Sequence, residues 1–128
     1  MELPLSVLKD YQDLWEVPGW KVVPRFDKHI IEDVIYQHGD RGKSGQVSGA
    51  YLNAKEEHMS VVQGHLHAQF GVLYHANTQT RIFGMQVGCG VDHEKAAMNY
   101  GKKYNRKPLL GCGVVLDGVT AICEPMKL

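Results

Sequence analysis

Residues 60 to 67 read Ser60-Val61-Val62-Gln63-Gly64-His65-Leu66-His67, an apolar segment that runs directly into two histidines. The β-branched residues of its first half predict a short strand, and Gly64 lets the backbone turn sharply where that strand ends. Residues two apart in an extended segment project to the same side, so we expect the imidazoles of His65 and His67 to reach one metal ion or two neighbouring ions. The segment therefore predicts a pair of metal ligands at the tip of a strand.

An earlier strand delivers another histidine. β-Branched residues predict a strand over residues 30–36, and His38-Gly39 follows at its exit. In an α/β sheet, polar residues with chemical roles gather in loops at strand ends. We therefore take His38 as a third candidate metal ligand. Asp40 offers a possible carboxylate beside it, although an aspartate in a turn more economically bonds its own backbone.

The rest of the chain alternates short helical and extended patterns. Apolar spacing predicts helices over 5–15, 46–57 and 93–104 and strands over 20–23, 30–36, 60–63, 70–75, 81–87, 110–116 and 119–123. Asp117-Gly118 is a strong signal for a hairpin between the last two strands. This order predicts an α/β fold in which one sheet, or a pair of sheets, is flanked by helices.

Composition and charge narrow the class of protein. A chain of 128 residues is expected to form one domain, over residues 1–128, around one core. Lysine plus arginine number 14, as do aspartate plus glutamate, and this balance gives no electrostatic signal for nucleic acid or an anionic membrane. No apolar run is long enough to cross a membrane and the first residues lack a secretory signal pattern, so we expect a cytoplasmic protein without membrane contact.

Histidine is the unusual component of this sequence, and cysteine is not. The chain has seven histidines, and histidine is the commonest metal ligand among the side chains. Its three cysteines, Cys89, Cys112 and Cys123, form an odd set without a Cys-x-x-Cys spacing. They predict reduced thiols rather than a disulfide framework or a cysteine zinc site.

Together the two histidine units, His38-Gly39 and Gly64-His65-Leu66-His67, resemble the C-terminal half of calcineurin-like metallophosphoesterases. Residues 35–118 look especially like the compact phosphoesterases encoded by bacteriophages. This similarity includes the segment Arg81-Ile82-Phe83-Gly84-Met85-Gln86-Val87-Gly88-Cys89. It implies the C-terminal half of a β-sandwich flanked by helices, and hydrolysis of a phosphoester at a two-metal centre. By resemblance, His38 and His65 bind one metal and His67 binds the other. The location would then be the host cytoplasm.

The motifs that mark the N-terminal half of this family are not complete in this sequence. No Gly-Asn-His motif occurs, and the one Gly-Asp, Gly39-Asp40, lies beside the later motif. Neutral imidazoles cannot replace the bridging carboxylates that hold a second ion. We therefore expect a C-terminal portion of a metal-dependent phosphoesterase that is inactive without an N-terminal half. Mixed imidazole and carboxylate sites accept Mn, Fe, Ni or Zn.

Two other functions compete with this hypothesis. One is a non-catalytic phage module that keeps the fold for binding or structure. The other is an enzyme completed by homo-oligomerisation, with carboxylates such as Asp40 or Asp92. A sheet that normally continues into a neighbouring half leaves apolar residues uncovered, at Val22-Val23 and Ile30-Ile31 or at Val61-Val62. We therefore expect a homo-oligomer, or association with a separate N-terminal half.

Overall fold

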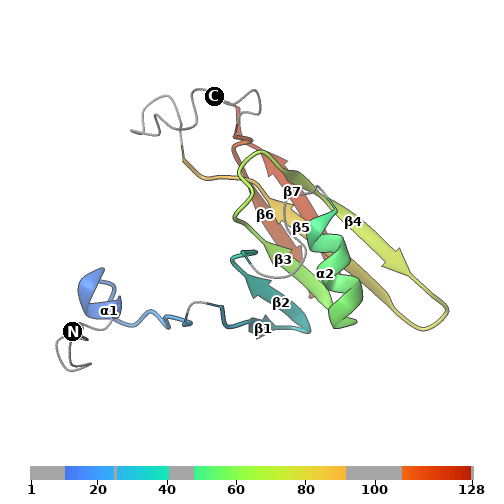
Figure 1. The fold of residues 1–128 in the computed structure, drawn as a ribbon, viewed down its shortest axis with the longest axis horizontal. Helices are drawn as coiled ribbons and strands as arrows, with labels where there is room; N and C mark the ends of the chain where they lie inside the picture. Colours follow the sequence, from blue (N-terminus) through green and yellow to red (C-terminus); the bar gives the residue numbers. More distant parts are fainter. Residues whose placement is uncertain (1–10, 25, 41–47, 92–107, 128) are drawn as a thin grey trace, which may run out of the picture.

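Two sheets and two helices make up the described chain. The computed structural model describes residues 11–24, 26–40, 48–91 and 108–127. In chain order its elements are α1 (Tyr11–Leu14), β1 (His29–Ile31), β2 (Val34–Gln37), α2 (Gly49–Glu57), β3 (Ser60–Gln63), β4 (Phe70–Ala76), β5 (Arg81–Val87), β6 (Gly111–Leu116) and β7 (Thr120–Pro125). Strands β1 to β5 form a five-stranded sheet in the order β1-β2-β3-β5-β4, and β6 pairs with β7 in a second sheet (Figure 1).

Three parallel strands form the middle of the larger sheet. β3 is parallel to both β2 and β5, while β1 and β4 pair antiparallel at the two edges. Parallel neighbours need a crossover connection, and α2 lies within the connection from β2 to β3. Figure 1 shows α2 lying along the sheet, where it contacts β3 and β5. Since β2, β3 and β5 are parallel, their carboxyl ends share one edge of the sheet.

Alternate residues of these strands pack on opposite faces of the sheet. The face that contacts the β6–β7 hairpin holds the larger buried apolar cluster: Val34, Val62, Phe83, Met85 and Ala121. The face that contacts α2 holds a smaller cluster: Ile35, Ala54 and Val61. The described fold is therefore a mixed α/β arrangement of helix, five-stranded sheet and two-stranded sheet.

Gly84 allows the close approach of α2 to β5. A Cβ atom at this position would lie 2.2 Å from the backbone nitrogen of Tyr51 and 2.3 Å from the carbonyl carbon of Ala50. Any side chain at residue 84 would therefore force the helix and the strand apart.

Most of the predicted strands are confirmed. The structure has strands at 60–63 and 81–87 as predicted, and β4 extends one residue beyond the predicted 70–75. The β6–β7 hairpin turns at Asp117-Gly118, and both residues have positive φ. α2 falls within the predicted helix over 46–57, and α1 occupies the end of the predicted helix over 5–15. The predicted helix over 93–104 lies outside the described residues.

Two strand predictions near the N-terminus are wrong. Residues 20–23 form no strand, because within the described chain this segment pairs with no other strand. The predicted strand over 30–36 is a hairpin, with β1 and β2 joined by Glu32 and Asp33. Both turn residues have positive φ, +49° and +58°, which is the pattern of a two-residue type I′ turn. That turn favours Asn-Gly, so Glu-Asp gave no local signal for it.

One of the surfaces expected to be uncovered is buried. Val61 and Val62 are 0% and 8% exposed, because α2 and the β6–β7 hairpin cover the two faces of β3. Ile30 and Ile31 of the edge strand β1 are exposed, as expected. Within the described part of the chain, no helix has the length and apolar character needed to cross a membrane.

Candidate functional site

The histidine-bearing loops leave the sheet side by side. His38 follows the last residue of β2, and Gly64-His65 follows the last residue of β3. These last residues, Gln37 and Gln63, are partners in the parallel register. The carboxyl edge of parallel strands is where α/β proteins place their ligand sites.

His38 and His65 are in direct contact. Nε2 of His38 lies 3.1 Å from Nδ1 of His65, and the rings meet edge to face with centroids 5.0 Å apart. Both residues are exposed. The backbone reinforces the pairing, because the amide of Gly64 donates a hydrogen bond of 3.1 Å to the carbonyl of His38. The structure thus unites two of the three predicted ligands, from segments 27 residues apart.

The spacing of the two nitrogens fits a shared metal ion. Two imidazole nitrogens bound to one divalent ion at about 2.1 Å, with ligand angles of about 90 to 110°, lie about 3.0 to 3.4 Å apart. The observed separation of 3.1 Å falls within that range. The same distance also suits a hydrogen bond between one protonated and one unprotonated nitrogen. The pair can therefore hold a proton between its rings or bind one cation with both.

His65 lies in a tight turn rather than in an extended segment. Its φ is +66°, and the amide of Leu66 donates a hydrogen bond of 2.7 Å to the carbonyl of Gly64. A hydrogen bond across three residues with a positive central φ defines the rare, strained form of γ-turn. The expectation that His65 and His67 project to one side of an extended segment is therefore wrong, and it is the turn that aims His65.

His67 lies further along the same loop and is half-buried. Its carbonyl accepts a hydrogen bond of 2.8 Å from the amide of Leu109, which ties the loop to the start of the β6 segment. Across residues 11–24, 26–40, 48–91 and 108–127, no group of three or more His, Cys, Asp and Glu side chains is close enough to hold a metal ion. His67 therefore does not complete a three-ligand group with His38 and His65 in this arrangement.

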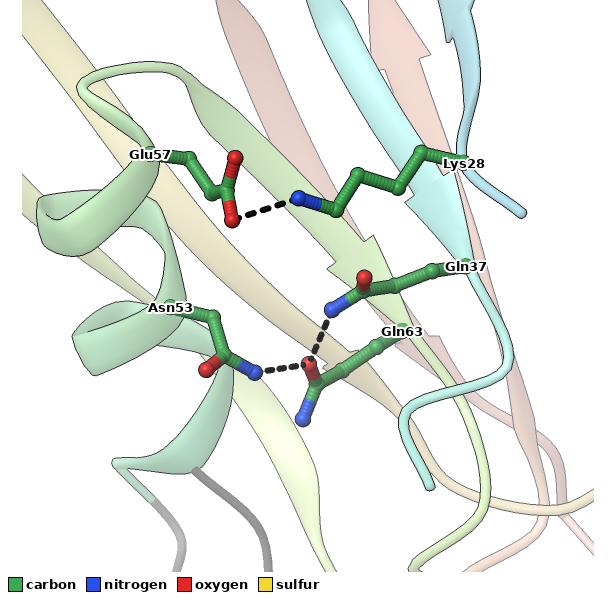
Figure 2. A network of polar contacts seen from close by, with 5 residues as sticks. All are labelled: Lys28, Gln37, Asn53, Glu57 and Gln63. Atoms are coloured by element: carbon green, nitrogen blue, oxygen red, sulfur yellow. Dashed lines mark hydrogen bonds and ion pairs between the residues drawn. The ribbon is translucent and has the colours of Figure 1, made fainter. Parts of the chain in front are cut away.

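A row of buried and half-buried side-chain amides lies beneath the histidine loops, and we name it the amide ladder. It consists of Gln37, Gln63 and Gln86 on adjacent strands, joined by Asn53 from α2. Figure 2 shows Gln37 and Asn53 converging on the side chain of Gln63. Sequence reasoning missed this feature, although Gln63 ends a predicted strand, Gln37 directly follows another, and Gln86 is one residue before the end of a third.

One Asp-x-His sequence, Asp27-Lys28-His29, leads into β1. Sequence reasoning counted Asp-x-His, a motif of the N-terminal half of the resembled family, as absent from this chain, and Asp27-Lys28-His29 shows that this was wrong. Lys28 forms an ion pair of 2.6 Å with Glu57 at the end of α2, and the two side chains are 43% and 37% exposed (Figure 2). Such an exposed pair adds little stability. His29 lies opposite Tyr36 in the β1–β2 register, which places this sequence near the same edge of the sheet.

Gln69 ends the loop that carries His67. It is 7% exposed, and its backbone amide donates a hydrogen bond of 3.1 Å to the backbone carbonyl of Leu66. Its side-chain oxygen is buried without a hydrogen-bond partner. A buried acceptor of this kind is costly unless a donor or cation reaches it.

The three cysteines are free, as predicted. Cys89 is buried and its sulfur accepts the amide of Val91 at 3.3 Å. Burial raises the pKa of the Cys123 thiol and the nearby Cys112 adds to this, whereas a backbone hydrogen bond from Gly71 opposes it. A raised pKa disfavours the thiolate, so Cys123 is suited to packing rather than to nucleophilic chemistry.

Among the described residues, the Tyr36 phenol also has a shifted pKa. Burial raises the pKa of its phenol, and the negative charge of Glu32 raises it further. Tyr36 packs against the apolar cluster on the hairpin side of the sheet.

Comparison of the chain with models of protein families, with curated proteins and with solved structures finds no match. We therefore base the functional proposal on the geometry of the two histidines and on the motifs that surround them.

Proposed function

We propose that this chain supplies histidine ligands to a divalent metal centre of a calcineurin-like metal-dependent phosphoesterase. The contact between His38 Nε2 and His65 Nδ1 at 3.1 Å carries the proposal, because it joins the two histidine units that resemble that family. His67 would serve a second ion, as the resemblance implies. The fold proposed for the complete enzyme is the family's β-sandwich, of which this chain would form the C-terminal half.

The metal pair would supply an activated water and would neutralise charge that develops on phosphorus. His38 and His65 bind in the neutral form, so they contribute no negative charge to balance the ions. We expect the carboxylate ligands to come from an N-terminal half of the enzyme or from a second copy of this chain. Mn, Fe, Ni and Zn all suit the donor set. Free cysteines fit a reducing compartment, which favours the cytoplasm.

Equilibrium dialysis of the purified chain against Mn²⁺, Ni²⁺ and Zn²⁺ tests the ligand assignment. We expect bound metal in the native chain and its loss in His38→Ala and in the double variant His65→Ala with His67→Ala. His75→Ala is the matched control, since His75 instead contacts the hydroxyl of Tyr51 at 3.3 Å. Unchanged stoichiometry in the double variant would overturn the assignment.

Hydrolysis of bis(p-nitrophenyl) phosphate tests whether the chain acts alone. We expect little or no turnover with any of the three metals, because among the described residues no Asp, Glu, Cys or further His side chain joins His38 and His65 in a group that could hold a metal ion. Robust turnover that disappears in His65→Ala would instead support an enzyme completed by homo-oligomerisation.

A further inference from the structure

The amide ladder connects the core of the sheet to the histidine loops. Gln63 pairs in register with Gln37 on one side and with Gln86 on the other, so three carboxamides lie in one row across β2, β3 and β5. Gln63 and Gln86 are each 1% exposed. Side chains this polar are rarely buried without a specific set of partners.

The hydrogen bonds of the ladder all run in one direction. Gln37 Nε2 donates to Gln63 Oε1 at 3.1 Å, and Asn53 Nδ2 donates to the same oxygen at 2.8 Å. Gln63 Nε2 then donates to Gln86 Oε1 at 3.1 Å. The last donor, Gln86 Nε2, hydrogen bonds to the carbonyl of Gly64.

That final carbonyl sets the orientation of the whole row. A backbone carbonyl can only accept, so Gln86 must present its NH₂ group to Gly64 and its oxygen to Gln63. Gln63 must in turn direct its own NH₂ group toward Gln86, which leaves its oxygen for Gln37 and Asn53. Reversing any one amide would place two donors or two acceptors against each other.

The same carbonyl closes the strained turn at His65. Gly64 oxygen accepts the amide of Leu66 across the γ-turn while it accepts the side chain of Gln86. A residue held at a strained φ persists only where its surroundings over-determine the conformation. The side chain of Gln86 restrains the Gly64 carbonyl by donating a hydrogen bond to it from the sheet.

The ladder also contacts the loop of the other histidine. A Cβ atom at Gly39 would lie 3.1 to 3.3 Å from three carbons of the Gln63 side chain, and Gly39 has a φ of +98°. Gln63 therefore packs closely against the residue that follows His38. Both histidine loops rest on the same row of amides.

We propose that Gln86, supported by Gln63, is a positioning residue that holds the γ-turn at His65 and thereby sets the imidazole pair in its metal-binding geometry. The effect on metal binding rests on the function proposed above, whereas the effect on the turn does not. Partners that orient metal ligands through a second layer of hydrogen bonds change metal affinity roughly 10- to 100-fold when they are removed.

Gln86→Met tests this role, because methionine fills a similar volume without an NH₂ group. Tyr74→Phe is the control: it removes the hydroxyl that accepts the amide of Ala121 at 2.8 Å and donates to its carbonyl at 3.2 Å, on the β4–β7 contact. Both variants lose two hydrogen bonds, but only Gln86→Met touches the histidine loop. If Gln86→Met does not fold, Gln86→Asn replaces it in the test. This substitution shortens the side chain by one methylene and withdraws its NH₂ group from the Gly64 carbonyl.

Two readouts are measured on each variant. Amide hydrogen exchange should show lost protection at Leu66, whose amide closes the γ-turn on the Gly64 carbonyl, relative to Met85 in β5, in the Gln86 variant and not in Tyr74→Phe. Calorimetric titration with Ni²⁺ should show affinity at least about tenfold weaker in the Gln86 variant and unchanged in Tyr74→Phe.

Each outcome has one meaning. Unchanged protection of the Leu66 amide in the Gln86 variant, or equal loss of Ni²⁺ affinity in both variants at matched stability, would refute the positioning role. If the native chain binds no Ni²⁺, the metal function fails, and the exchange readout alone decides whether Gln86 holds the turn.

Discussion

At the scale of the residue, His65 joins an unfavourable backbone to a useful side chain. Its φ of +66° belongs to the left-handed region, where a residue with a Cβ atom is strained. The turn brings its Nδ1 to 3.1 Å from Nε2 of His38. The contact therefore does not require an extended backbone at residue 65. Substitutions at residue 65 can therefore separate the effect of backbone strain on stability from the effect of the imidazole on metal binding.

We expect His65→Gly to be more stable than His65→Ala by about 1 kcal/mol, because glycine accepts a positive φ and alanine does not. Both variants should lose the metal binding that depends on the imidazole. Urea unfolding of the two variants measures the difference. Equal stability would show that the turn at residue 65 carries no strain.

At the scale of the element, two small features set how the helix and the edge strand join the sheet. Gly84 permits backbone contact between α2 and β5, and the type I′ turn at Glu32-Asp33 folds β1 back on β2. The carboxyl edge bearing His38 lies at the end of β2. A disruptive substitution at Gly84 or in the turn at Glu32-Asp33 would therefore displace the site without changing a histidine.

Gly84→Ala should destabilise the chain by about 3 kcal/mol, since the new methyl group meets backbone rather than a movable side chain. Gly90→Ala is the matched control: a Cβ at Gly90 meets nothing within 4 Å, and its φ is not in the left-handed region. The control should change the free energy of unfolding by less than about 0.5 kcal/mol. Similar values for the two variants would contradict the close approach of α2.

Asp33→Gly should stabilise the chain by about 1 kcal/mol, because glycine is favoured at the second position of a type I′ turn. Asp33→Ala removes the same carboxylate but keeps a Cβ, and we expect it to be destabilising. Thermal unfolding of the pair isolates the backbone effect from the charge. If alanine stabilised as much as glycine, the gain would come from the charge and not from the turn.

At the scale of the whole molecule, apolar side chains of the described residues remain exposed on the edge strand β1 and on the β6–β7 hairpin, among other places. Ile30 and Ile31 on the edge strand β1 are 54% and 48% exposed. On the β6–β7 hairpin, Val114 and Ile122 are cross-strand partners and are 41% and 42% exposed. Edge strands and apolar faces of this kind favour association.

We expect the purified chain to form a dimer or a higher oligomer, or to bind a separate N-terminal half where one is present. Light scattering coupled to size-exclusion chromatography at micromolar concentration measures the state. Ile31→Lys should shift it toward monomer if β1 forms the contact, and Val114→Lys should do so if the hairpin face forms it. A stable native monomer would contradict the prediction.

Local sequence signals were sufficient for the α/β class, for β3 with the histidines after it, and for the hairpin at Asp117-Gly118, because periodicity and turn residues act within a few positions. They failed at Glu32-Asp33, whose positive φ values are imposed by pairing of β1 with β2. Only the tertiary structure placed His38 against His65, aligned Gln37, Gln63 and Gln86 in one row, and showed why residue 84 has no side chain. These features depend on strand order and register, and register arises from the packing of both faces of the sheet rather than from any one segment.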